Sequence, residues 1–405
     1  MRRLYLLAAV AMAGVSAVFA LLAELEKQFD LSTTSLGWIA GSAFLAALVT
    51  QLWLARYADR GHATTLLRLG TLIAAAGLIW FGASTQTWQF VAARALLGAG
   101  VGMIIPPARR AIVLTSGDST GERLGAFYAA YLAGFVFGPP VASALTVLTD
   151  DVRVPFLVFG IGTVAVFFSL IGLELPESQR GDAPTDAESR RVIRRLLRSR
   201  AFVASLLIIV SFRYSIGVFE PLWATHLDDL GASTLLIGVS LTFFALPMLI
   251  VARPAGRLSD RYNPRVVSLL AAAATVPMMA VYGYAGVVWI IFLVAVPHGL
   301  MEAILSPGSQ AAIAEATADD DAASAQGLAE AGGSAASAIG AFTAPAIFEA
   351  LGAGPAWLIA AGVMSLLLTC SYFVCRPGRL NDKAEKGERG QLDLRQLSAR
   401  EGPAE

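Results

Sequence analysis

The amino-acid sequence predicts an all-α membrane protein in which twelve transmembrane helices form two pseudo-symmetric six-helix bundles. Three observations predict this class: an apolar composition, long unbroken apolar runs, and an internal repeat with a constant offset. Hydrophobic residues make up 56% of the 405 residues and charged residues 15%, and the mean hydropathy is +0.65. Apolar runs of roughly 20 residues match the thickness of a bilayer. Because the runs are continuous rather than alternating, we expect helices and not a barrel.

The twelve runs follow one another along most of the chain. The first follows Arg2 and Arg3 and so resembles a secretory signal, but its apolar stretch is longer than a typical signal core. The repeat described below also requires this run as a helix, so we expect it to be retained. The predicted spans are, in order, 4–24, 35–55, 66–84, 87–108, 122–148, 153–173, 202–224, 234–252, 265–285, 287–313, 322–348 and 355–375.

The basic residues predict the orientation of these spans. With the N-terminus in the cytosol, all but four of the 30 Lys and Arg residues lie on the cytosolic side or in cytosolic termini. Lys27 and Arg153 then lie outside, while Arg94 and Arg213 lie within helices. Because cytosolic loops carry the excess of Lys and Arg, both termini are expected in the cytosol. We expect a multi-pass protein of the cytoplasmic (cell) membrane.

An internal repeat divides the chain into two halves. A constant offset of 201 residues that holds across three helices predicts two bundles of equal handedness, residues 1–173 and 201–375, related by an axis along the membrane normal. The matched residues are Ser32, Thr33, Gly37, Asp59, Gly98 and Pro106 in the first half, and Ser233, Thr234, Gly238, Asp260, Gly299 and Pro307 in the second.

A polar segment, residues 174–200, separates the halves, and a polar tail, 376–405, follows the last span. Within the separating segment, Thr185 and Glu188 have the spacing of a helix capping box. The residues that follow place one apolar face opposite six arginines, which predicts a basic amphipathic helix on the inner leaflet. A solvated charged tether is the alternative. The tail lacks periodicity and is expected to be disordered.

Two similar polar phrases follow the second span of each half. They are ARYADRG at 55–61 and GRLSDRY at 256–262, and both are expected in a short cytosolic turn. Their charges can contact helix ends when the cytosolic side is closed, although a turn that merely obeys the charge rule is the alternative. The candidate gate residues are Asp59, Arg60, Gly256, Asp260 and Arg261.

The second phrase, Gly256–Arg261, resembles the signature loop of the major facilitator superfamily of secondary transporters. The first copy departs from it, because Ala55 stands where glycine is usual and Gly61 precedes His62 in place of a basic ending. The stretch from Arg94 to Gly100 is similar to the family's fourth-helix motif, whose arginine is associated with proton handling.

A third motif lies in the fifth run. Gly125, Gly134, Gly138 and Pro139 are spaced as in the fifth-helix motif of the family's 12-helix drug–proton antiporters, although Ala142 and Ser143 replace its closing glycines. Glycines four residues apart on one helix face allow a neighbouring helix to approach closely. A helix crossing without bearing on transport direction is the alternative interpretation.

Ionisable groups inside the spans are the candidate transport residues. Each costs roughly 2.5–3.5 kcal/mol near the bilayer centre unless it is paired or hydrated. They lie only in runs that line the cavity in the resembled family, and they form a slightly acidic set that can exchange a proton and bind a cation. Internal salt bridges that only fix helix packing are the alternative. The candidates are Arg94, Tyr128, Tyr131, Arg213, Glu220, His298, Glu302 and Glu330.

Together these features predict a secondary transporter and not an enzyme. The three lysines lack a following Ser or Thr, so no phosphate-binding loop is present, and three histidines with two cysteines do not make a metal site. The resemblance implies export of small amphipathic molecules in exchange for protons, without a cofactor, by a monomer that contacts lipid and no nucleic acid. The alternatives are a sugar or metabolite exporter, a proton symporter, and a non-transporting membrane sensor.

Overall fold

The computed structural model describes residues 1–57, 62–116, 120–175, 186–318 and 321–374, and helices make up nearly all of them. Long apolar segments satisfy their backbone groups internally as helices, which is what a lipid environment requires. The helices are α1 (Arg2–Phe29), α2 (Thr33–Tyr57), α3 (Ala63–Ala83), α4 (Thr87–Ser116), α5 (Thr120–Thr149), α6 (Val154–Ser169), α7 (Asp186–Arg198), α8 (Arg200–Asp229), α9 (Thr234–Arg261), α10 (Pro264–Tyr284), α11 (Val288–Glu315), α12 (Ala322–Leu351) and α13 (Ala353–Val374).

Eleven of the described helices are long and apolar enough to cross a membrane, and α6 is shorter. We expected the sixth span over residues 153–173, but α6 has 16 residues, about 24 Å of helix. Helical structure stops at Ser169, and Gly172 then adopts a positive φ of 78° that turns the chain away. The all-α membrane fold is confirmed, with a sixth helix that is shorter than predicted.

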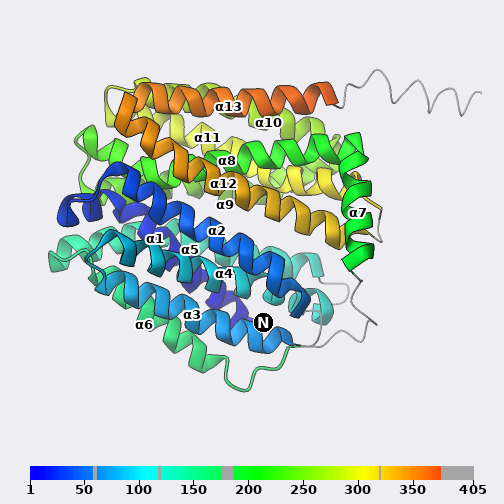
Figure 1. Ribbon diagram of the computed structural model, residues 1–405, viewed down its shortest axis with the longest axis horizontal. Helices are drawn as coiled ribbons and strands as arrows, with labels where there is room; N and C mark the ends of the chain where they lie inside the picture. Colours follow the sequence, from blue (N-terminus) through cyan, green and yellow to red (C-terminus); the bar gives the residue numbers. More distant parts are fainter. Residues whose placement is uncertain (58–61, 117–119, 176–185, 319–320, 375–405) are drawn as a thin grey trace, which may run out of the picture.

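The helices form two groups that follow chain order (Figure 1). In the first, α1 packs against α5 and α6, while α3 packs against α4 and α6. In the second, α8 packs against α12 and α13, while α10 packs against α11 and α13. The groups meet mainly where α2 packs against α12 and where α5 packs against α9.

The sequence repeat is visible in the close contacts of glycines. Gly98 of α4 leaves no space for a Cβ atom because it lies against the backbone of Ala43 in α2. Its repeat partner Gly299 of α11 lies in the same way against Phe244 in α9. Since Ala43 and Phe244 are themselves 201 residues apart, both members of each contact obey the repeat.

Two further glycines mark where the groups cross. Gly37 of α2 lies against Ala341 and Pro345 of α12, and its repeat partner Gly238 of α9 lies against Pro139 of α5. The two crossings are therefore symmetry equivalents. Small residues allow the helices of opposite halves to approach closely at both places.

The segment between the halves contains the expected basic helix, α7. It lies across the ends of the other helices (Figure 1). Leu196 is buried and, with Val192, packs against residues of α8, α11 and α12. Arg195 forms an ion pair with Asp321, with the nitrogen 2.5 Å from the oxygen. One apolar side of α7 is therefore covered by protein rather than by lipid, while Ile193 and Leu197 remain exposed. Thr185 and the side chain of Glu188, the expected capping box, lie outside what is described.

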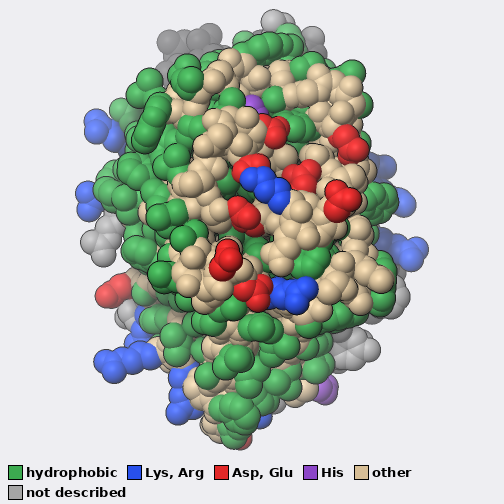
Figure 2. All heavy atoms as spheres, turned by 90° about the vertical axis from the view of Figure 1, so that its left-hand side faces the viewer, with side chains coloured by type: hydrophobic (Ala, Val, Ile, Leu, Met, Phe, Trp, Pro, Cys, Tyr) green, Lys and Arg blue, Asp and Glu red, His purple; other side chains and the backbone are tan. Residues whose placement is uncertain are grey.

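At the end opposite α7, polar side chains join the two halves. Glu26 accepts a hydrogen bond from Thr225 at 3.0 Å, and Lys27 forms an ion pair with Asp228. Thr34 donates to Glu349 at 2.6 Å. Figure 2 shows this end, where acidic side chains gather with basic ones among them. These bonds hold the two halves together on this side.

Candidate transport site

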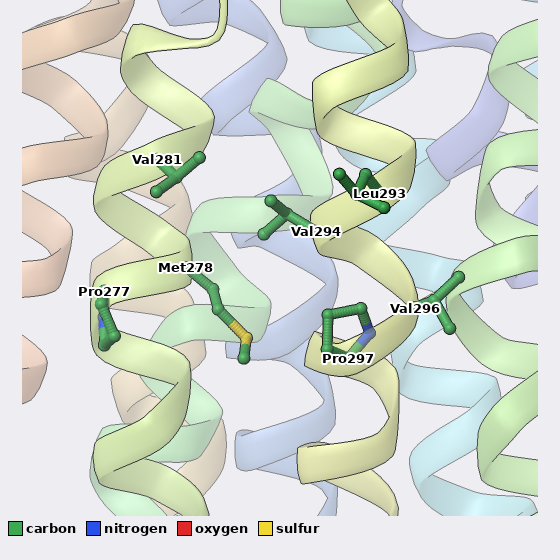
Figure 3. Close-up of a pocket in the computed structure, with 7 residues that line it drawn as sticks. All are labelled: Pro277, Met278, Val281, Leu293, Val294, Val296 and Pro297. Carbon is green, nitrogen blue, oxygen red and sulfur yellow. The ribbon is translucent and has the colours of Figure 1, made fainter.

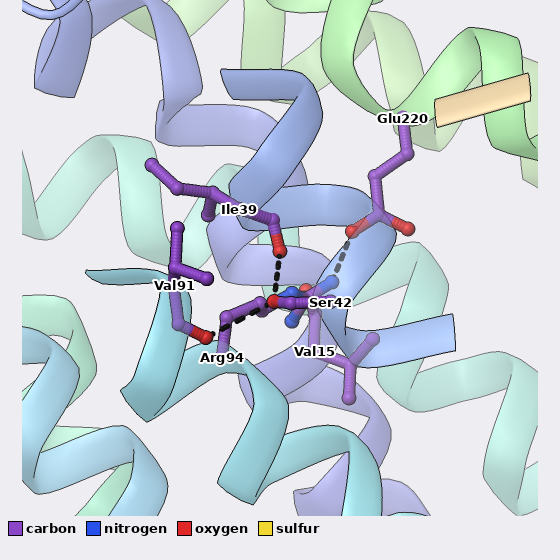
Figure 4. Close-up of polar contacts among 6 residues, drawn as sticks. All are labelled: Val15, Ile39, Ser42, Val91, Arg94 and Glu220. Atoms are coloured by element: carbon purple, nitrogen blue, oxygen red, sulfur yellow. Dashed lines mark hydrogen bonds and ion pairs between the residues drawn. The ribbon is translucent and has the colours of Figure 1, made fainter. Parts of the chain in front are cut away.

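A buried ion pair joins the two halves, nearer the end opposite α7 than the end that carries it. Arg94 of α4 is 1% exposed and Glu220 of α8 is 6% exposed, and the guanidinium contacts the carboxylate directly (Figure 4). The carbonyl of Val15 in α1 lies 3.5 Å from a second nitrogen of Arg94. Because each charge is removed from water, the partner is what makes its burial tolerable. The Arg94–Glu220 ion pair therefore links α4 of the first half to α8 of the second half.

A serine beside this pair fixes how α2 lies against α4. Ser42 donates to the carbonyl of Ile39 in its own helix at 2.8 Å and lies 3.0 Å from the carbonyl of Val91 in α4 (Figure 4). Val91 precedes Arg94 by about one helical turn, on the same side of α4. This contact positions the turn from which Arg94 extends toward Glu220.

A second ion pair lies on α8 and α12. Arg213 and Glu330 approach to 3.6 Å, and their side chains are 29% and 36% exposed. The backbone carbonyl of Arg213 accepts a hydrogen bond from Ser337 at 2.6 Å, and Gly333 leaves room for the arginine side chain. Tyr131 of the other half lies near both charges. In contrast to the Arg94–Glu220 pair, this one is partly open to its surroundings.

The third charged group lies on α11, entirely within the second half. His298 Nε2 and Glu302 Oε1 are 3.5 Å apart, and both residues are buried. Tyr282 of α10 places its hydroxyl 3.1 Å from His298 Nδ1. The rings of Phe219 and Phe244 lie 5.3 Å from the imidazole. Among the described residues, the buried carboxylate of Glu302 thus has no guanidinium partner.

The predicted candidates are therefore sorted into separate clusters. Arg213 and Glu220 are seven residues apart and so share one side of α8, but each pairs with a residue of a different helix. Tyr128 and Tyr131 stack on each other with ring centroids 6.2 Å apart. Tyr128 also packs with Leu132 of α5 at the contact with α9. The tyrosines thus lie at the boundary between the halves, beside the Arg213 cluster.

The glycines of the fifth-helix motif have different surroundings. Gly134 lies against the backbone of Ala9, and Gly138 lies against Ala13 and Ser16, all on α1. The predicted close approach of a neighbouring helix is confirmed at these two positions. Gly125 has open space around it. The fourth member, Pro139, presents its carbonyl to Gly238 of α9, so the motif contacts both its own half and the other.

This difference gives a stability prediction. Gly134→Ala is expected to lower the free energy of unfolding by about 1–3 kcal/mol, because the added methyl group overlaps the Ala9 carbonyl and over-packs the crossing. Gly125→Ala is the matched control and is expected to be neutral or stabilising by up to about 1 kcal/mol, since alanine favours helix. Thermal unfolding of the detergent-purified variants checks both. Equal behaviour of the two variants contradicts the packing role of the motif.

The two polar phrases are only partly described. Asp59 and Arg60 lie outside the described residues, as does the side chain of Asp260, and of Gly256 only the helical backbone is described. Arg261 is exposed, and its guanidinium carbon lies 5.6 Å from the ring centre of Tyr262. The second phrase was expected in a turn, but α9 continues to Arg261. The turn is short because α10 begins at once: the side chain of Asn263 caps it by accepting hydrogen bonds from the amides of Arg265 and Val266.

The polar contacts on the side opposite α7 were missed from the sequence as functional candidates. Lys27 and Asp228, which bond to each other, are 201 residues apart and are therefore repeat equivalents. Residues that are equivalent in the two halves can contact each other only near the symmetry axis. The repeat could therefore have identified Lys27 and Asp228 as a candidate contact between the halves. Glu24, Glu26, Thr34 and Glu349 belong to the same set of contacts between the halves.

An apolar groove of about 640 Å³ lies elsewhere, between α10 and α11 (Figure 3). Its walls are formed by Pro277, Met278, Val281, Leu293, Val294, Val296 and Pro297. Leu293 is 76% exposed, so the groove opens to the outside of the bundle. With no ionisable side chain in its walls, it is a lipid-facing surface and not part of the charged site.

Two repeated groups of spanning helices, with a buried ion pair between them, are an arrangement typical of membrane transporters. The chain belongs to the Major Facilitator Superfamily, whose sequence profile matches residues 4–227 and 205–401. It is a multi-pass membrane protein.

Individual relatives are similar at low identity. Multidrug resistance protein 1 of Bacillus subtilis (strain 168) is 24% identical over 222 residues, 54% of this chain and 56% of the relative. Multidrug resistance protein MdtG of Enterobacter lignolyticus (strain SCF1) is 24% identical, over 68% of this chain and 66% of the relative. The chain thus spans little more than half the length of the first of these relatives.

Solved structures show the fold alone, because their identities are low. The nucleoside transporter NupG has a TM-score of 0.76 at 13% identity, covering 92% of this chain and 98% of its own. A bacterial homolog of the human lysosomal transporter Spinster, in an inward-facing and occupied conformation, has a TM-score of 0.76 at 14% identity, covering 92% and 96%.

Proposed function

We propose that this protein exports small amphipathic molecules from the cell in exchange for protons, by alternating access of its two halves. The multidrug-resistance names of its relatives and the fifth-helix motif support the export of drug-like compounds. The apolar helices with few polar contacts favour broad specificity for neutral or cationic substrates. The energy source is the proton gradient, no cofactor takes part, and the working unit is a monomer in the cell membrane with both termini cytosolic.

The surroundings of Glu302 are the observation that carries the proton coupling. Arg94 neutralises Glu220 and Arg213 faces Glu330, whereas within the described parts of the chain the one ionisable side chain that Glu302 contacts is a histidine, at 3.5 Å. A buried carboxylate without a permanent cationic partner can alternate between a proton and a cationic substrate. The same competition makes proton uptake drive the release of the substrate.

The contacts between the halves support alternating access. At the end opposite α7, hydrogen bonds and the Lys27–Asp228 ion pair hold the halves together. The Arg213–Glu330 pair, in contrast, is about one-third exposed. This conformation fits a state that is closed to the outside. In the state that is closed to the cytosol, the polar segments 55–61 and 256–262 would form the gate.

Transport by purified protein tests the proposal. In proteoliposomes or everted vesicles with an acidic interior, addition of a lipophilic cation such as ethidium is expected to dissipate the pH gradient. Uptake of the cation is expected to stop when an ionophore removes that gradient. Substrate movement in the same direction as protons would indicate symport instead. Binding of the cation without any movement would indicate a sensor, and both outcomes contradict the proposal.

The Glu302→Gln variant tests the residue assigned to the proton. We expect gradient-driven transport to fall at least about tenfold with normal expression, because the amide keeps the shape but cannot exchange a proton. Glu122→Gln, at an exposed carboxylate near the start of α5, is the matched control and is expected to keep transport. The measurement is ethidium uptake into everted vesicles at equal protein levels. Unchanged transport in Glu302→Gln removes this residue from the mechanism.

A further inference from the structure

A second pocket lies at the end of the molecule that carries α7. It has a volume of about 460 Å³ and forms where the end of α7 and the start of α8 meet the last turn of α13. Its walls mix two guanidinium groups with apolar side chains. They are Leu197, Arg198, Arg200, Val203, Phe373 and Val374.

The position of this pocket places it at the membrane surface. Arg200 is the first residue of the spanning helix α8, and Val374 is the last residue of the spanning helix α13. The ends of spanning helices lie at the level of the lipid headgroups. Leu197 and Phe373 are 50% and 57% exposed, so apolar side chains border the pocket on its outer side.

The two arginines supply charge that other groups do not neutralise. Within the described part of the chain, neither Arg198 nor Arg200 forms an ion pair, whereas Arg195 of the same helix is paired with Asp321. Both arginines are exposed. Guanidinium groups bind phosphate through two parallel hydrogen bonds, which makes two adjacent arginines suited to a phosphodiester.

Two contacts fix the backbone segments that form the walls of this pocket. Leu196 is buried against α8, α11 and α12, so the end of α7 is anchored to the second half. Ser199, between the two arginines, caps α8 by accepting a hydrogen bond from the amide of Phe202 at 3.4 Å. The backbone positions from which the two arginines extend are therefore fixed by folded structure on both sides.

We propose that this pocket binds one anionic phospholipid. The phosphodiester lies between Arg198 and Arg200, and an acyl chain lies along Leu197, Val203 and Phe373. Charge complementarity selects the anionic headgroup, while the apolar wall distinguishes a lipid from a free phosphate. This site does not depend on the transported substrate or on proton coupling.

Lipid titration of the full-length protein in detergent, followed by native mass spectrometry, tests the proposal. We expect one phosphatidylglycerol to bind at least tenfold more tightly than phosphatidylcholine with the same acyl chains. Inorganic phosphate or glycerol phosphate at equal concentration is expected not to displace it. Equal binding of the two lipids, or displacement by the soluble anions, overturns the proposal. These comparisons need no variant.

A pair of double variants separates a defined site from general attraction to basic residues. Arg198→Gln with Arg200→Gln is expected to weaken phosphatidylglycerol binding roughly 25-fold, about fivefold per arginine near an anionic lipid surface. Arg191→Gln with Arg194→Gln removes the same charge from exposed positions of α7 outside the pocket. This control is expected to change binding less than twofold, and an equal loss in both double variants overturns the proposal.

Discussion

The Arg94→Met variant is expected to lose gradient-driven transport and about 3–5 kcal/mol of the free energy of unfolding. Removing the guanidinium leaves the buried carboxylate of Glu220 without its partner, and an uncompensated buried charge is strongly destabilising. Transport falls for a second reason, because the pair is the ionic link between the two halves that must separate and re-form in each cycle. Urea or thermal unfolding and transport in proteoliposomes measure the two effects.

A double variant separates the structural from the functional role of this pair. Arg94→Met with Glu220→Leu replaces both charges with apolar side chains, which is often neutral for stability. We expect its free energy of unfolding to return to within about 1 kcal/mol of the original protein while transport remains absent. Recovery of transport together with stability would show that the pair only fixes helix packing.

The partly exposed pair provides a matched comparison. Arg213→Met removes a charge from a pair with 3.6 Å separation and about one-third exposure. Pairs that water can reach contribute about 0–1 kcal/mol, so this variant is expected to unfold nearly as the original protein does. A loss as large as that of Arg94→Met contradicts the distinction between the two sites.

Locking the end opposite α7 is expected to abolish transport completely. Thr34 and Glu349 come from different halves, and both the amide and the hydroxyl of Thr34 contact the carboxylate, at 2.9 and 2.6 Å. In a background in which Cys370 and Cys375 are replaced by serine, Thr34→Cys with Glu349→Cys places two thiols across this contact. A short bifunctional thiol reagent with a reducible bond is expected to stop transport, because the halves can no longer separate on this side.

Reversal of the block provides the control for this experiment. Reduction of the cross-link is expected to restore at least about half of the transport, and each single cysteine variant is expected to be unaffected by the reagent. A cross-linked protein is identified by its mobility on denaturing gels after cleavage between α6 and α8. Full transport by cross-linked protein would show that this end does not open during the cycle.

Much of the architecture followed from simple chemical requirements. A run of about 20 apolar residues has few options besides a spanning helix, so eleven spans were predicted at nearly their observed positions. The repeat was equally accessible, because close helix crossings require small residues, and Gly98 and Gly299 occupy matching places. The sixth span was predicted too long because its last residues are as apolar as a helix interior, while Gly172 ends the helix through its backbone conformation.

The site was predicted less completely. The cost of burying charge identified Arg94 and Glu220 as candidates, but not that they pair with each other. Spacing along α8 related Arg213 to Glu220, whereas in the fold each is paired with a residue more than 100 positions away in sequence. The proposed lipid pocket could not be predicted for the same reason: Arg198 and Phe373 are far apart in sequence and line one pocket only in the folded protein.

The sequence by itself determined that this chain crosses the membrane as repeated helices and which charges must be shielded within it. These are local properties, set by hydropathy, by the spacing of glycines and by the free energy of placing each side chain in lipid. Only the tertiary structure decided that Arg94 meets Glu220 and that Arg213 meets Glu330, because the two members of each pair lie on different helices. The reason is that ionic partners are chosen by proximity in space, and helix packing brings together residues that no sequence spacing relates.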